Sequence, residues 1–96
     1  MDAQHESYRQ YMKGQFQEWE SRIADLNSVV HMLEGDARRE YEHHLRQLQS
    51  YHRSVFHKYW DLLLAGEDQW DEMQAELDAA TDQLNAMLTE FILQPA

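Results

Sequence analysis

The stretch from residue 66 to residue 91 reads GEDQWDEMQAELDAATDQLNAMLTEF, and it decides the fold class. Its apolar residues recur three and four positions apart in strict alternation, which is the spacing of a buried helical stripe in a coiled-coil seam. The stripe runs through Trp70, Met73, Leu77, Ala80, Leu84, Met87 and Phe91. The spacing predicts a helix over residues 68–93 that packs along this stripe.

A tight turn is expected just before this helix. Gly66 favours the left-handed conformation that closes many helices. Asp68 is a good N-cap residue, and Asp71 lies in the first turn, where an acid interacts favourably with the helix dipole.

The same spacing extends upstream through most of the chain. One stripe runs through Tyr8, Met12, Phe16, Trp19, Ile23, Leu26, Val30 and Leu33, and it continues through Ala37, Tyr41, Leu45, Leu48, His52, Val55, Tyr59 and Leu62. We therefore expect helices over about 4–34 and 36–64, in a single all-α coiled-coil or bundle domain over 1–96. Three glycines and one proline leave few helix breakers.

The segment Gly35–Asp36 allows two architectures. If the helix continues through it, residues 4–64 form one rod about 90 Å long, and 68–93 folds back as the shorter arm of a hairpin. The uncovered apolar stripe of that rod would drive two chains to associate antiparallel into a bundle. If the chain turns at Gly35, it forms a monomeric three-helix up-down-up bundle, related to the dimer by domain swapping. We favour the continuous helix and the homodimer.

The predicted interaction seam consists of residues on these stripes. Its members are Phe16, Trp19, Ile23, Leu26, Val30, Leu48, His52, Val55, Trp70, Leu77 and Leu84. His52 is the polar member. It is interpreted as a partly buried histidine bonded to an acid, with a pH-sensitive element and a register-specifying residue as alternatives.

Charge and composition exclude several classes of partner. The net charge is −10 with histidine neutral, and residues 61–96 carry nine acids and no lysine or arginine. Such a chain repels nucleic acid and anionic membranes, and no apolar run approaches the roughly 18 residues that span a bilayer. The absence of cysteine fits a reducing compartment, so a cytoplasmic location is expected.

Chemistry-bearing residues are sparse, although the chain has six histidines. Glu40 and His43 have the Glu-x-x-His spacing of di-iron bundles, and His44 is adjacent, but such sites need two of these motifs plus two more glutamates. These three residues are weak metal candidates, and we expect no metal and no cofactor. We find no strained serine elbow or phosphate loop, so no enzyme activity is expected. Trp60, if exposed beside Tyr59, would suit an anchor for a partner.

Four short sequence motifs resemble those of a family of small bacterial proteins that are described only as coiled-coil domain-containing proteins. They are Trp19-x-x-x-Ile23, Asp36-Ala-Arg-x-Glu40-Tyr41, Leu45-x-x-Leu48 and Ala65-Gly66-Glu67-x-x-Trp70-x-x-Met73, and the likeness covers about residues 8–90. Members often lack a glycine at the position of Gly35, which favours the unbroken helix. The resemblance implies a helical fold and self-association, without activity, cofactor or catalytic residue.

The sequence therefore predicts a non-enzymatic structural or protein-interaction module whose partner is a second copy of itself or another protein. The alternative is a helical bundle that binds a metal or ligand through histidines and carboxylates. A membrane-surface helix is disfavoured because the polar face is acidic.

Overall fold

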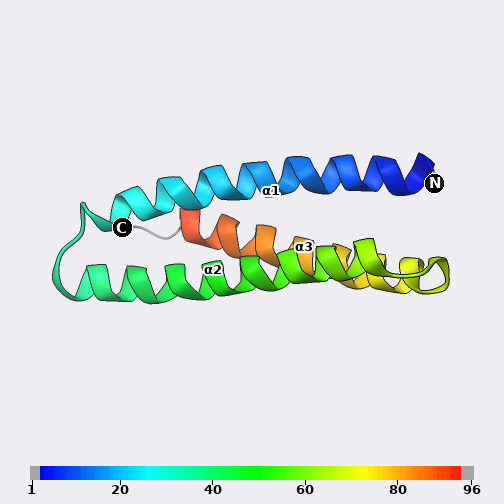
Figure 1. Cartoon of the computed structure of the whole chain (residues 1–96). Coiled ribbons are helices and arrows are strands. Elements are labelled where there is room, and N and C mark those ends of the chain that lie inside the picture. Colours follow the sequence, from blue (N-terminus) through cyan, green and yellow to red (C-terminus); the bar gives the residue numbers. More distant parts are fainter. Residues whose placement is uncertain (1–2, 94–96) are drawn as a thin grey trace. The chain divides into compact units, whose positions relative to one another are not determined.

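The computed structural model describes residues 3–93, and every regular element in that range is an α-helix (Figure 1). Helix α1 spans Ala3–Val30, α2 spans Gly35–Leu64 and α3 spans Glu67–Leu93. No strand occurs in the described residues, so the prediction of an all-α protein is confirmed. None of these helices combines the length and the apolar character that crossing a membrane requires.

The chain divides into two compact units, Met1–Tyr41 and Glu42–Ala96. The first unit holds α1, the connection 31–34 and the beginning of α2, and the second holds the rest of α2 together with α3. The prediction of a single domain stays a prediction.

The continuous helix over residues 4–64 is wrong for this structure, because the chain leaves the helix after Val30 and starts α2 at Gly35. Two backbone hydrogen bonds between residues three positions apart close the end of α1. The Met32 N–H donates to the Val29 carbonyl (2.9 Å), and the Leu33 N–H donates to the Val30 carbonyl (3.2 Å). Gly35 has φ +64°, a left-handed conformation that costs other residues roughly 1–2 kcal/mol. The glycine therefore makes this turn accessible.

Within the first unit, Tyr41 joins the start of α2 to the end of α1. Its hydroxyl donates a hydrogen bond to the Leu26 carbonyl at 3.1 Å. The ring is half-buried, and this burial raises the pKa of the Tyr41 hydroxyl, because the charged phenolate is poorly solvated there. The neutral hydroxyl is the form that donates to the carbonyl.

Within the second unit, α3 folds back antiparallel to the later part of α2 (Figure 1). The turn differs in detail from the prediction. Gly66 is not left-handed, since Gly35 is the positive-φ residue among those described. Helix α3 begins at Glu67, so Asp68 lies in the first turn and is not the N-cap. The Gly66 carbonyl instead accepts the N–H of Gln69 at 3.1 Å.

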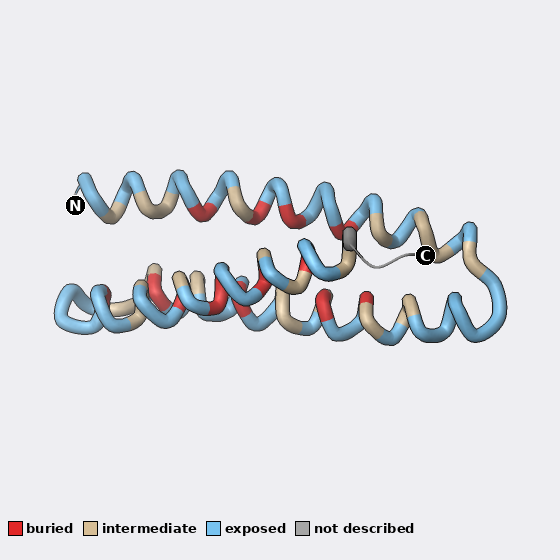
Figure 2. Tube along the Cα trace, turned by 180° about the vertical axis from the view of Figure 1, so that it is seen from behind, coloured by how far each residue is buried: buried red, intermediate tan, exposed pale blue. Residues whose placement is uncertain are grey.

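Buried positions recur along one side of each helix at steps of mostly three or four residues (Figure 2). They are Met12, Phe16, Trp19 and Ile23 in α1, Leu45, Leu48, Val55 and Leu62 in α2, and Trp70, Leu77, Ala80, Thr81, Leu84 and Leu88 in α3. Ala37, which the stripe included, is exposed. In the last turns of α3, Leu88 is fully buried whereas Met87 and Phe91 are half-buried.

Candidate interaction surface

The residues of the predicted interaction seam are mostly buried. Phe16, Trp19, Ile23, Leu48, Val55, Trp70, Leu77 and Leu84 are buried, whereas Leu26, Val30 and His52 are half-buried. In the second unit, the buried members are therefore not the side chains that an approaching partner would meet. A surface for recognition has to be sought among the exposed residues.

The weak metal candidates do not form a site. Glu40 and His43 are exposed on α2, and His44 is half-buried. The His43 ring lies 3.3 Å from the side-chain nitrogen of Gln47, measured between Nε2 atoms, and 5.8 Å from the His44 ring. Across residues 3–93, no three histidine, aspartate or glutamate side chains come close enough together to hold a metal ion.

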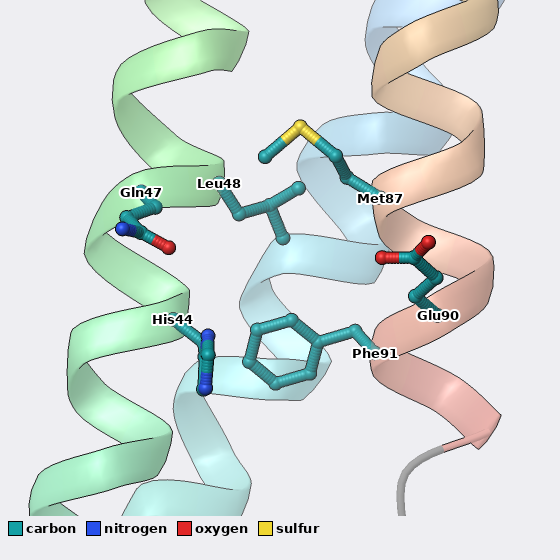
Figure 3. A pocket seen from close by; sticks show the side chains of 6 residues that line it. All are labelled: His44, Gln47, Leu48, Met87, Glu90 and Phe91. Atoms are coloured by element: carbon teal, nitrogen blue, oxygen red, sulfur yellow. The ribbon is translucent and has the colours of Figure 1, made fainter.

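A small pocket lies between α2 and α3 within the second unit (Figure 3). Leu48 from α2 and Met87 and Phe91 from α3 point toward one another across it, and its polar lining is His44, Gln47 and Glu90. Its volume is about 90 Å³. Ligand sites usually occupy roughly 300–1,000 Å³, so this pocket suits ordered water better than a substrate.

The second unit instead presents large apolar side chains to solvent. Phe56 is 42% exposed, Trp60 48% and Leu64 82%. They follow one another at four-residue steps on α2, so they lie on one side of the helix. The rings of Phe56 and Trp60 are 6.1 Å apart and nearly perpendicular at 73°, which is a favourable edge-to-face geometry. Tyr59, half-buried, is also 6.4 Å from the Trp60 ring.

Arg53 extends this line of side chains by one turn toward the start of α2. At 3.6 residues per turn, an arc of about 80° around the helix contains Arg53, Phe56, Trp60 and Leu64. The centre of this arc lies roughly 120° around the helix axis from the centre of the buried face. We call these four residues the outer stripe. Arg53 is exposed and forms no ion pair with any residue in the described part of the chain.

The chain segment that follows the outer stripe carries negative charge. The last turn of α2 contains no basic residue, so its terminal carbonyls are not offset by a nearby cation. Glu67 and Asp68 follow in the first turn of α3. The outer stripe is therefore cationic at Arg53 and apolar from Phe56 to Leu64, and the chain just beyond Leu64 is acidic.

Sequence reasoning identified Trp60 only on the condition that it is exposed, and it missed Phe56 and Leu64. The available signal was their four-residue spacing with Trp60, outside the seam positions. Sequence reasoning also missed Thr81 and Leu88, although Leu77, Thr81, Leu84 and Leu88 repeat the seam spacing. Thr81 is 2% exposed, and its hydroxyl has no hydrogen-bond partner among the described residues.

Comparison with known proteins gives no relative: no protein-family model matches the chain, and no significant match is found among curated proteins or solved structures.

Proposed function

We propose that this chain is a non-enzymatic helical interaction module that acts through its outer surface and associates with a second copy of itself. The observation that carries the proposal is the outer stripe, where three large apolar side chains and an arginine without an ion pair among residues 3–93 lie together on one helix.

Exposed apolar side chains scattered singly are normal on soluble proteins, but contiguous ones mark interaction sites. Tryptophan and arginine are also the residue types most enriched among those that dominate binding energy at protein interfaces. Trp60 and Arg53 bring both types to one side of α2, next to Phe56. This composition supports an interface better than it supports a reaction site.

The chemistry of the other features supports the same proposal. The pocket beside His44 is too small for most substrates. Another protein remains the second possible partner of such a surface.

Sedimentation velocity over a concentration series tests self-association directly. The mass of one chain is 11.5 kDa. We expect the mass-average molar mass in solution to rise from this value toward that of a dimer as the protein concentration increases to about 1 mM. A value that stays at the mass of one chain throughout would contradict the proposal.

Calorimetric titration with Zn²⁺, Ni²⁺ and Fe²⁺ tests the competing metal-binding function. We expect no tight stoichiometric binding, because the described residues bring no three ligands together. Stoichiometric binding that His43→Ala or His44→Ala abolishes would favour the metal-binding bundle instead.

A further inference from the structure

We propose that the outer stripe is a two-fold interface, on which α2 of a second copy packs antiparallel with Trp60 near the symmetry axis. This inference rests on the proposed function and specifies the surface and the orientation of self-association.

The apolar part of the outer stripe is complementary to its own copy. In an antiparallel pair of helices centred on Trp60, a residue four positions before the centre faces the residue four positions after it in the other chain. Phe56 then packs against the partner's Leu64, and Leu64 against the partner's Phe56. A two-fold interface requires this reciprocity, because the same patch serves both chains.

The charges of the outer stripe also fit this orientation. Arg53 lies seven residues, or about 10 Å, before Trp60, whereas α2 ends about 6 Å after it at Leu64. In the antiparallel pair, Arg53 therefore reaches just past the end of the partner's α2. It meets terminal carbonyls without a neighbouring base there, followed by the acidic first turn of α3 that contains Glu67 and Asp68.

A parallel pair would lose this complementarity. Each Arg53 would then face the partner's Arg53, and the two acidic ends would also face each other. Like charges placed directly opposite are destabilising. The charge distribution along the outer stripe therefore selects the antiparallel orientation.

The size of the outer stripe predicts a weak dimer. Three partly exposed apolar side chains per copy form a contact smaller than the roughly 800 Å² per partner of standard interfaces. We expect a dissociation constant on the order of 10–100 μM. Such a dimer is visible by sedimentation at high concentration and dissociates on dilution.

Single substitutions in the full chain test which surface is used. Trp60→Ala should weaken self-association at least tenfold, as measured by sedimentation equilibrium. Tyr11→Ala is the matched control, because Tyr11 is a comparably exposed aromatic residue (51%) on α1, and its dissociation constant should stay within twofold of the wild type. Circular dichroism should show unchanged helix content in both variants.

A charge exchange tests the role of Arg53. The Arg53→Glu variant should associate several-fold more weakly, and adding Glu67→Lys and Asp68→Lys should recover most of that loss. Weakening without any recovery would contradict the assigned contact between Arg53 and the acidic turn.

Cysteine cross-linking tests the orientation, and the natural chain contributes no cysteine of its own. Phe56→Cys and Leu64→Cys proteins of different tag mass are mixed in equal amounts and oxidised mildly. The antiparallel interface predicts mainly disulfides between the two different proteins, since those positions face each other. Mainly self-linked products of each protein would indicate a parallel pair and overturn the inference.

The two proposals fail in distinguishable ways. A wild-type chain that stays monomeric at all concentrations would overturn both. A wild-type dimer that Trp60→Ala leaves equally tight would retain self-association and overturn the outer stripe as its site. Flexible glycines inserted into the connection 31–34 should not change the dissociation constant, whereas a swapped dimer would dissociate.

Discussion

Trp60 and Trp70 lie on either side of the turn at Ala65–Gly66, but their surroundings are opposite. Trp60 is 48% exposed, whereas Trp70 is 4% exposed and its indole N–H donates to the Gln74 side-chain oxygen at 2.8 Å. A buried indole needs such an acceptor, and an exposed one has water. The position of a residue around the helix, relative to the buried stripe, therefore decides its role. Trp70 contributes to folding, and Trp60 is available for recognition.

The largest expected effect is that of Trp70→Ala on stability. Removing a buried tryptophan loses its transfer free energy and leaves a cavity, so the free energy of unfolding should fall by about 3–5 kcal/mol. Urea denaturation followed by circular dichroism measures this change. A loss below about 1 kcal/mol would mean that the site collapses freely and would weaken the contrast with Trp60.

A smaller effect of opposite sign is expected for Thr81→Val, on the same buried side of α3 as Trp70. The buried Thr81 hydroxyl has no hydrogen-bond partner within the described range. Replacing this hydroxyl by a methyl group of similar size should therefore raise the free energy of unfolding by about 1 kcal/mol. Thr89→Val is the matched control. Its exposed hydroxyl bonds the Asn85 carbonyl at 2.9 Å, and its replacement should change stability by less than about 0.5 kcal/mol. Destabilisation by Thr81→Val would point to a polar partner for that hydroxyl.

The smallest expected effect on folding is that of Trp60→Ala. At low concentration, where the chain is monomeric, its free energy of unfolding should lie within about 0.5 kcal/mol of the wild type, because the ring is half-exposed and Ala favours the helix. Urea denaturation at a few micromolar provides the measurement. A loss comparable to that of Trp70→Ala would show that Trp60 is part of the core.

The buried seam was predictable because burial depends on spacing, and spacing is visible in a sequence. Positions such as Trp19, Leu48 and Leu77 needed only a count of three and four. The same count overlooked Thr81, because a hydroxyl-bearing side chain was not considered a member of an apolar stripe. Leu88 was not predicted because only one buried residue was expected at each step of three or four, whereas the buried side of α3 is wider than that.

The break between α1 and α2 was not predictable from the stripe, because the apolar spacing continues through it. Two local terms compete there: the helical propensity of the flanking residues and the access of Gly35 to a left-handed φ. Ala37 is too small for its burial to decide between them, and the structure leaves it exposed. The resemblance to a family of bacterial coiled-coil proteins favoured the continuous helix, which is wrong for this structure, because members of that family often lack this glycine.

The outer stripe could be predicted only in part, because exposure is a property of the folded chain. The spacing of Phe56, Trp60 and Leu64 was readable, but whether a neighbouring helix covers them was not. The role proposed for Arg53 depends on its exposure, on its lack of an ion pair among residues 3–93, and on the acidic turn that follows Leu64. The first two of these properties belong to the folded chain and could not be read from the sequence.

Gly35 makes the turn between α1 and α2 sensitive to mutation at one codon. Every single-nucleotide change in a glycine codon that alters the amino acid adds a β-carbon. Among residues 3–93, no atom outside Gly35, its two chain neighbours and the adjoining helix backbone lies within 4 Å of such a carbon. Crowding would therefore not disfavour a side chain at this position, and the penalty comes from the left-handed backbone. Substitution of Gly35 would therefore favour a continuous helix over the turn between α1 and α2. When position 35 is fully randomised and variants are selected for the turned structure, we expect glycine to be the residue most often selected.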